Sequence, residues 1–522
     1  MDELRYPIGV QTFSELIKGG YVYVDKTKFI LQLMKQGKYI FLSRPRRFGK
    51  SLFVTTLKAY FEGRRNLFKG LAIDKADCDW TPSPVLHFDF NTGAYLEDEG
   101  LHKRIDATLS RYEELYAIKS SDGSVSALPL RFENLIRTAH EATGRQVVIL
   151  VDEYDKPMLA LEEKHPLYEK HQRMLKNFYS NFKSMDEHIR FVFITGVARF
   201  SKVSIFSDLN NLDDISLEED YADICGITEE ELISTFRSGI EFLAEKRKEN
   251  YNTTLKLLRE YYDGYLFAAE GPRLYNPFSL LRTLKAKSMD PFWFETGTPT
   301  FLVNLIKRNR INPQGINGRM CSKRELMRVN LNSTDPVPLM FQTGYLTIDH
   351  YDRDLDAYIL RFPNREVEIS FAEDLLPKYV QGTDNSESPF SILNFRKDLF
   401  SGNPQDFMKR LSTVFKDLPS EDQNESVYRA VTYLVCKLCS LNPLAEHHGF
   451  KGRSDLEVVT SRFIYLFEFK YNKSIQEALN QIYDRDYAGR FALDSKQVFI
   501  IGANYVNTKN DKGLYYDIKV VE

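Results

Sequence analysis

The chain contains few cysteines, and its hydrophobic runs are all short. Of its 522 residues only five are cysteine, at positions 78, 225, 321, 436 and 439. This sparse, odd set argues against a disulfide framework and fits a reducing compartment. No apolar run approaches the roughly 20 residues that span a bilayer, and the polar segment Met1–Tyr6 lacks the apolar core of a signal peptide. We therefore expect a cytoplasmic protein with no membrane partner.

A strong charge of one sign is also absent. The net charge is -3, with 43% hydrophobic and 27% charged residues, which is ordinary for a globular protein. The field of the whole protein does not attract phosphate, so a nucleic-acid partner would need a local basic patch. Basic residues cluster at 44–50 and 307–310, although such runs are most often solvated surface.

The length exceeds what one hydrophobic core supports, so several domains are expected. Between residues 39 and 195, apolar strands alternate with helical segments, which predicts an α/β domain with a parallel sheet covered on both faces. We place this first domain at residues 1–228. Its expected strands are Tyr39–Ser43, Val85–Phe90, Val147–Val151 and Phe191–Thr195.

The rest of the chain divides into a middle region and a C-terminal domain. Residues 229–381 are expected to be helical and, by analogy only, winged-helix-like, with a helix start capped by Asn276. The polar stretch 382–389 has the composition of a linker. Residues 390–522 begin with helical stretches and continue strand, strand, helix, strand, which predicts a compact α/β unit.

A candidate P-loop follows the first strand. Such a loop wraps backbone N–H groups around phosphates, places a lysine on the β- and γ-phosphates and a hydroxyl on Mg²⁺. Gly49, Lys50 and Ser51 match the last three positions, while Arg44 replaces the usual first glycine. The residues expected to bind the nucleotide from this loop are Arg46, Arg47, Phe48, Gly49, Lys50, Ser51 and Leu52. Solvated loop arginines are an equally good interpretation of Arg46 and Arg47.

Two acids end a second apolar strand, in the pattern of a Walker B motif. Asp152 is expected to hold Mg²⁺ together with Ser51, and Glu153 to orient the attacking water. Two accessory residues follow the next strand. Thr195 could contact the γ-phosphate and Arg199 could sense it; ordinary loop polarity and a surface salt bridge are the alternatives.

These segments resemble the bacterial AAA-ATPase-like family. The resemblance rests on 23–27 (Tyr-Val-Asp-Lys-Thr), 44–52 (Arg-Pro-Arg-Arg-Phe-Gly-Lys-Ser-Leu), 151–155 (Val-Asp-Glu-Tyr-Asp) and 194–199 (Ile-Thr-Gly-Val-Ala-Arg). It covers most of the chain. In that family the first loop glycine is usually missing, residues 23–27 would lie near the nucleotide base, and a PD-(D/E)XK nuclease-like domain typically follows at the C-terminus.

The C-terminal residues fit such a nuclease centre. Metal-dependent phosphodiester cleavage needs hard oxygen ligands and a group that activates water or stabilises the transition state. Asp455 and Glu468 could bind Mg²⁺, and Lys470, two residues beyond Glu468, points to the same face of its strand. Asp455 is expected at the start of the preceding strand of an antiparallel hairpin. The alternative is a hairpin with ordinary surface charges.

Several neighbours could complete this second centre. Glu446 or Glu425 could add an acidic ligand, and Gln481 and Tyr487 lie on the following helix, where similar nucleases place such residues. The sequence thus predicts an ATP-dependent, Mg²⁺-requiring nuclease acting on nucleic acid, with DNA favoured, and leaves a homo-oligomer open. The alternative is a nucleotide-switched binding module whose C-terminal domain holds nucleic acid without cutting it.

Overall fold

The computed structural model describes the chain from residue 4 to 521, apart from 77, 119–122, 162–164, 200–204, 207–208, 210, 294–315, 328–334, 380–391, 417, 419–422, 442, 450–451, 492–493 and 509. Its contacts divide into two compact units. The first comprises Met1–Trp293 with Met320–Arg365, and the second Phe294–Arg319 with Glu366–Glu522. The three-part division at residues 228, 381 and 390 stays a prediction, and the linker expected at 382–389 lies outside the described residues.

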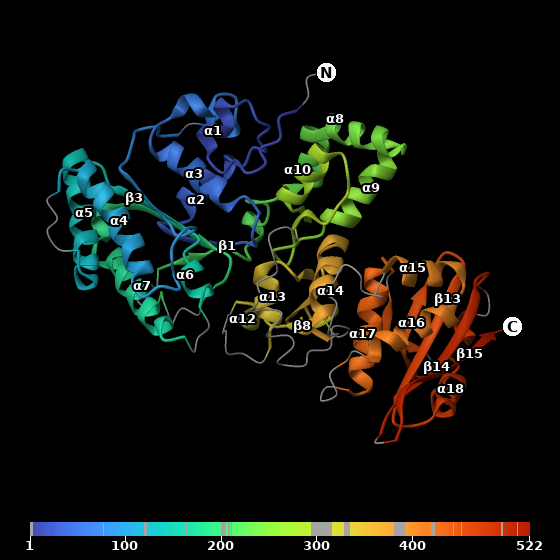
Figure 1. Cartoon of the computed structure of the whole chain (residues 1–522). Coiled ribbons are helices and arrows are strands. Elements are labelled where there is room, and N and C mark those ends of the chain that lie inside the picture. The colour runs from blue at the N-terminus through green and yellow to red at the C-terminus, as the bar shows by residue number, and fades with distance from the viewer. Residues whose placement is uncertain are drawn as a thin grey trace. The chain divides into compact units, whose positions relative to one another are not determined.

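The first unit contains a parallel five-stranded sheet (Figure 1). Its strands lie in the order β2 (Val85–Asp89), β3 (Val147–Asp152), β4 (Ile189–Gly196), β1 (Tyr39–Ser43) and β5 (Asp213–Asp214). Every residue of β3 is buried, as expected of a strand covered on both faces. The α/β class and the first four strands are confirmed.

Helices cover this sheet and connect its strands. Helix α3 (Lys50–Phe61) packs against β2, β3 and β4, while α4 (Gly100–Leu115) packs on β2 and α5 (Leu128–Thr143) on β3. Parallel strands need such crossover helices, because the chain must return to the same edge each time. The other helices of this part are α1 (Phe13–Lys18), α2 (Lys28–Gln36), α6 (Lys156–Leu159) and α7 (Leu167–Ser184).

Three helices follow the sheet and share a separate hydrophobic core. They are α8 (Glu229–Arg247), α9 (Tyr251–Tyr262) and α10 (Pro277–Ala286), with the short pair β6 (Ile227–Thr228) and β7 (Leu274–Tyr275) beside them. The expected cap is confirmed, because the Asn276 side chain accepts from the backbone N–H groups of Phe278 and Ser279. The capping side chain satisfies donors that the helix itself leaves unpaired.

A small unit of mixed strands and helices follows this helical cluster. It consists of β8 (Arg319–Cys321), α12 (Lys323–Leu326), α13 (Val337–Thr343), β9 (Thr347–Asp352) and β10 (Ala357–Arg361). The strands form a sheet in the order β8-β10-β9, with β10 and β9 antiparallel.

The second unit combines helices with a mixed sheet (Figure 1). The sheet order is β11 (Leu444–Gly449), β12 (Gly452–Val459), β13 (Phe463–Tyr471), β14 (Gln497–Asn507) and β15 (Lys512–Val521). Pairs β12/β13 are antiparallel and β13/β14 parallel, with α18 (Ile475–Asp484) packed on β13 and β14. The helices before the sheet are α14 (Arg365–Tyr379), α15 (Ile392–Ser401), α16 (Pro404–Lys416) and α17 (Glu425–Leu438). Strands β11 and β15 had not been predicted.

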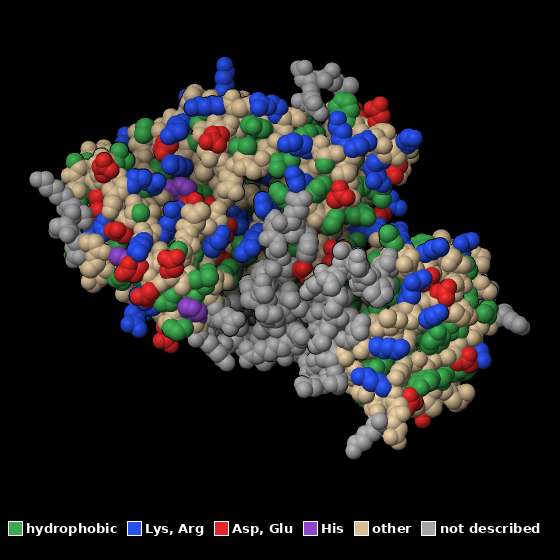
Figure 2. All heavy atoms as spheres, viewed as in Figure 1, with side chains coloured by type: hydrophobic (Ala, Val, Ile, Leu, Met, Phe, Trp, Pro, Cys, Tyr) green, Lys and Arg blue, Asp and Glu red, His purple; other side chains and the backbone are tan. Residues whose placement is uncertain are grey.

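In the part of the chain that the structure describes, none of the helices is long and apolar enough to cross a membrane. On the face shown in Figure 2, Lys and Arg side chains are interspersed with acidic ones instead of forming one block.

Candidate functional sites

The loop between β1 and α3 has the backbone of an anion-binding turn. Gly49 has a positive φ of 93° and immediately precedes Lys50, the first residue of α3. The unpaired N–H groups at this helix start, together with the helix dipole, favour a bound phosphate. Arg44, at the position of the missing glycine, is a structural residue: its buried guanidinium donates to the carbonyls of Ser216 and Tyr221 at 2.8 and 2.9 Å.

Arg46, Arg47 and Phe48 of the loop differ in what they can offer a nucleotide. Phe48 is buried, with its ring packed on Tyr265, so only its backbone could face a phosphate. Arg47 is exposed and lies over the ring of Phe278 at 4.3 Å. Arg46 is also exposed and has its charge open to solvent or ligand. The roles expected of Arg46, Arg47, Phe48 and Leu52 in nucleotide binding stay predictions.

The structure brings the P-loop lysine and serine to the acids after β3. Lys50 Nζ lies 3.2 Å from the Glu153 carboxylate and donates to the Pro45 carbonyl at 3.2 Å. Ser51 and Asp152 both line the cavity beside this loop. Glu153 itself has a positive φ of 51°, a conformation that costs free energy in a non-glycine residue and clusters at functional sites.

Asp152 is poised to accept a cation. It is 4% exposed, and its Oδ1 has no hydrogen-bond partner among the residues the structure describes. Burial, followed by the charge of Glu153, raises the pKa of Asp152 to about 7. A cation would compensate the buried charge that burial disfavours. A polar cavity of about 260 Å³ is lined by Asp152 together with Ser51, Lys58, His87 and Asp89, among others.

Sequence reasoning missed the role of Asp155, which organises the neighbouring turn. Its fully buried carboxylate accepts the backbone N–H groups of Val197 and Ala198 at 2.9 and 2.5 Å. A Cβ on Gly196 would lie 2.4 Å from Asp155 Oδ1, so this position requires glycine. The acid at 155 and the glycine at 196, both inside the quoted motifs, are the signal that could have found this contact.

The two accessory residues make contacts within the protein. Thr195 is fully buried, and its hydroxyl donates to the Leu42 carbonyl of β1 at 2.8 Å. Arg199 forms an ion pair with Asp214 at 2.6 Å, and its backbone N–H donates to Gln342. Both side chains thus have protein partners, and their contact with a γ-phosphate stays a prediction.

A second cavity, apolar and of about 90 Å³, has Gly49 in its lining. It lies between the N-terminal segment and the helical cluster, and its lining includes Val22, Tyr23, Val24, Ile227 and Pro277. A flat, largely apolar ring such as a nucleobase fits a site of this chemistry.

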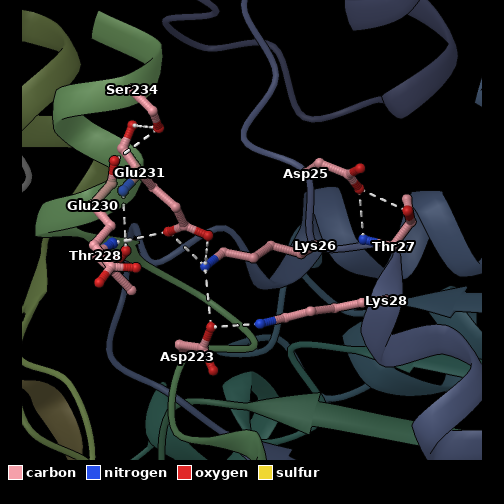
Figure 3. A network of polar contacts seen from close by, with 9 residues as sticks. All are labelled: Asp25, Lys26, Thr27, Lys28, Asp223, Thr228, Glu230, Glu231 and Ser234. Carbon is pink, nitrogen blue, oxygen red and sulfur yellow. Dashed lines mark hydrogen bonds and ion pairs between the residues drawn. The ribbon is translucent and has the colours of Figure 1, made fainter. Parts of the chain in front are cut away.

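The residues beside this cavity are held by a network of ion pairs, shown in Figure 3. Lys26 donates to both oxygens of Glu231 at 2.6 and 2.7 Å. Asp223 forms an ion pair with Lys28 at 3.1 Å. Glu231 also completes the capping box of α8 with Thr228. The network ties the N-terminal segment to the start of α8.

In the second unit, the antiparallel pair β12/β13 brings Asp455 and Glu468 together. Asp455 lies in the middle of β12, not at a strand start as expected, because residues 452–454 extend this strand by pairing with β11. Its Oδ2 accepts the backbone N–H of Phe469 at 2.8 Å. Lys470 Nζ donates to Glu468 Oε1 at 2.8 Å, so the two side chains do share one face.

Glu468 has the same electrostatic character as Asp152. It is fully buried, and its Oε2 lacks a hydrogen-bond partner within the described part of the chain. Burial, followed by the charge of Asp455, raises the pKa of Glu468 to about 7. A divalent cation between these carboxylates would stabilise the ionised form.

Two arginines near this centre had not been predicted. Arg429 on α17 donates from Nη1 to Asp455 Oδ1 at 2.9 Å. Arg485 donates to the Tyr487 hydroxyl at 3.2 Å. Of the expected supporting residues, Glu425 begins α17 one turn before Arg429, and Gln481 lies on α18. Tyr487 lies three residues beyond the end of α18, not on the helix as expected. Glu446 lies on β11.

Among the described residues, no group of three or more His, Cys, Asp or Glu side chains is arranged to hold a metal ion. Mg²⁺ rarely needs one, because it keeps several waters and takes one or two carboxylates plus substrate phosphates. Ser51 with Asp152, and Asp455 with Glu468, fit that pattern.

Comparison with known proteins agrees with this geometry. Residues 7–206 match the AAA-ATPase-like family model, described as a predicted AAA-ATPase, and residues 423–512 match a model of the PD-(D/E)XK nuclease superfamily. The chain is 36% identical to an "uncharacterized protein in vnfD 5'region" of Azotobacter chroococcum mcd 1, over 97% of both chains. No solved structure gives a significant match.

Proposed function

Because this chain belongs to the AAA-ATPase-like family and ends in a domain of the PD-(D/E)XK nuclease superfamily, we propose that it hydrolyses ATP and cleaves nucleic acid, with DNA the favoured substrate, in a Mg²⁺-dependent reaction. One observation supports the proposal at both sites: each has a buried carboxylate oxygen, Asp152 Oδ1 and Glu468 Oε2, with no partner among the described residues. Such an oxygen is costly unless a cation binds it.

At the first site, the loop N–H groups and Lys50 would bind the phosphates, and Ser51 and Asp152 would hold Mg²⁺. Glu153 would orient the water and accept its proton, once the phosphates draw Lys50 away from it. The base would enter the apolar cavity at Val24 and Ile227, close to Gly49.

At the second site, Asp455 and Glu468 would hold Mg²⁺, which when bound supplies charge stabilisation and a more acidic water. Lys470, held by Glu468 and by the Phe469 carbonyl, would stabilise the charge that develops on the phosphodiester. Lys470 is 8% exposed, so water would screen the interaction of its charge with the phosphodiester only weakly.

The purified protein with Mg²⁺, DNA and RNA, with and without ATP, tests this proposal beside Lys50→Ala and Lys470→Ala. We expect Lys470→Ala to abolish cleavage while ATP hydrolysis continues, and Lys50→Ala to abolish hydrolysis. Cleavage that persists in Lys470→Ala, or hydrolysis that persists in Lys50→Ala, would contradict the corresponding half.

A second candidate is a nucleotide-switched module that binds nucleic acid without cutting it. The Arg429–Asp455 ion pair favours it, because a guanidinium already neutralises one of the two carboxylates. Under this function no condition yields cleavage, and Lys50→Ala changes nucleic-acid binding or the oligomeric state measured by light scattering.

A further inference from the structure

Arg429 is bound to a carboxylate that the nuclease chemistry would need for its metal ion. Its Nη1 lies 2.9 Å from Asp455 Oδ1, and the two side chains are 18% and 10% exposed. The other oxygen of Asp455 is held by the backbone N–H of Phe469. A metal ion reaching Asp455 therefore competes with Arg429 and leaves the backbone contact in place.

The charges around the Arg429–Asp455 pair mean that this competition would change the net charge of the site. Two cations, Arg429 and Lys470, form ion pairs with Asp455 and Glu468, and the charge of Arg485 also interacts with both carboxylates. Lys470 is paired with Glu468. Arg485 has a raised pKa, first through its hydrogen bond to Tyr487 and in smaller part through the charges of Glu468 and Asp455. When a divalent ion neutralises the carboxylates, a cationic surface is left to attract a phosphodiester.

The position of Arg429 suits a side chain with two partners. It projects from the second turn of α17, which packs against β12 and β13. Guanidinium groups recognise carboxylates and phosphates through the same planar donor pattern. The side chain can therefore exchange one anion for the other without a change of backbone.

We propose that Arg429 exchanges one anionic partner for another when a metal ion binds. Its guanidinium neutralises Asp455 while no metal ion is bound, and it binds the phosphodiester of the nucleic acid once a divalent ion takes the carboxylate. This inference rests on the proposed nuclease function and assigns Arg429 a role that opposes metal binding and favours substrate binding.

Binding measurements without cleavage test the exchange. Mn²⁺ affinity is measured by calorimetry in nucleotide-free protein. The binding signal that Asp455→Asn removes is assigned to the site at Asp455. Arg429→Ala is expected to bind Mn²⁺ about tenfold more tightly, since a competing cation near the carboxylate has gone. In the presence of Ca²⁺, Arg429→Ala should bind a labelled oligonucleotide more weakly than the wild type. The slope of log affinity against log salt concentration should fall in magnitude by about one.

Arg429→Lys is the matched control, because it keeps the charge and loses the planar donors. We expect its Mn²⁺ affinity to stay near that of the wild type. Circular dichroism identifies a variant that fails to fold, and if Arg429→Ala does so, Arg429→Gln, which also removes the charge, replaces it in the test. Mn²⁺ affinity that is unchanged or weaker in Arg429→Ala would overturn the exchange and leave Arg429 only a positioning residue for Asp455. A wild-type Mn²⁺ signal that Asp455→Asn does not alter would instead contradict the proposed nuclease function.

Discussion

Lys50 Nζ lies 3.2 Å from the carboxylate of Glu153. The contact joins the first residue of α3 to the turn after β3, two segments about a hundred positions apart in the chain. Phosphates bound by the loop would compete with Glu153 for the same ammonium. The pair therefore links nucleotide binding to the release of the residue proposed to orient the water.

Glu153→Gln should separate binding from turnover. The amide keeps the shape of the side chain but cannot accept a proton, so ATP hydrolysis should fall by about 100-fold or more. ATP affinity should stay the same or rise, because Lys50 loses a competing anion. Phosphate release and titration with a fluorescent ATP analogue measure the two effects. Hydrolysis within twofold of the wild type would show that Glu153 is not the base.

The Lys26–Glu231 pair should show measurable coupling. Glu231→Gln keeps the capping box, since glutamine also serves at this position, and removes only the charge. Lys26 is 8% exposed in this pair, so each single change, Lys26→Met or Glu231→Gln, should cost about 1–3 kcal/mol of unfolding free energy.

The double variant should be less destabilised than the two single effects combined, by about 1 kcal/mol. Urea unfolding of the four proteins, followed by intrinsic fluorescence, gives the coupling free energy. Additive effects would mean that the network in Figure 3 contributes little to holding the N-terminal segment on α8.

Gly344→Ala should displace the P-loop, although Gly344 is not part of this loop. Gly344 ends α13 with a φ of 88°, and an added Cβ would lie 2.7 Å from Pro45. Gly70 is the matched control, because it has a similar φ of 84° but open space around it. Gly70→Ala should therefore cost only the backbone strain, about 1 kcal/mol.

In Gly344→Ala we expect ATP turnover to fall about tenfold or more, because small displacements of positioning groups are costly in catalysis. Steady-state hydrolysis and thermal unfolding are compared in both variants. Equal behaviour of the two would mean that Pro45 yields to the added methyl without moving Lys50.

His87 should make the first unit sensitive to acid. Burial lowers the pKa of His87 to about 4, against an ordinary value of 6.5. Between these values the unfolded chain binds the proton more readily, so stability falls as the pH drops from about 6.5 toward 4. The effect is at most about 3 kcal/mol, at 1.36 kcal/mol per pKa unit.

His87→Gln should reduce this loss while keeping the cavity polar. Unfolding free energies of both proteins at pH 7.5, 6 and 5 measure the difference in slope. Parallel pH profiles would show that His87 is protonated in the folded protein as easily as in the unfolded one.

Much of the fold was predictable because its signals are local. The strand before Arg44 and the strand ending at Asp152 are short apolar runs bounded by breakers, and both are present as expected. The Asn276 cap and the shared face of Glu468 and Lys470 depend on residues only a few positions apart.

Long-range partners were not predictable from such patterns. Arg44 looked like a substituted P-loop residue, but its guanidinium is buried among carbonyls more than 170 positions away. Strand β11 has little apolar alternation and was not predicted. The pairing with β11 that extends β12 to residues before Asp455 was therefore missed. Arg429 has no spacing that marks it, because its contact with Asp455 arises from the packing of α17 on the sheet.

The sequence by itself determined which acids, lysines and glycines follow the strands, since strand periodicity and loop composition depend on neighbouring residues. Only the tertiary structure decided which of these side chains are buried, so that their ionised form is disfavoured. Asp152 and Glu468 lose their water because other elements cover them, and desolvation depends on atoms brought from distant parts of the chain. The same packing gave Asp455 its guanidinium partner, the contact on which the exchange proposed for Arg429 depends.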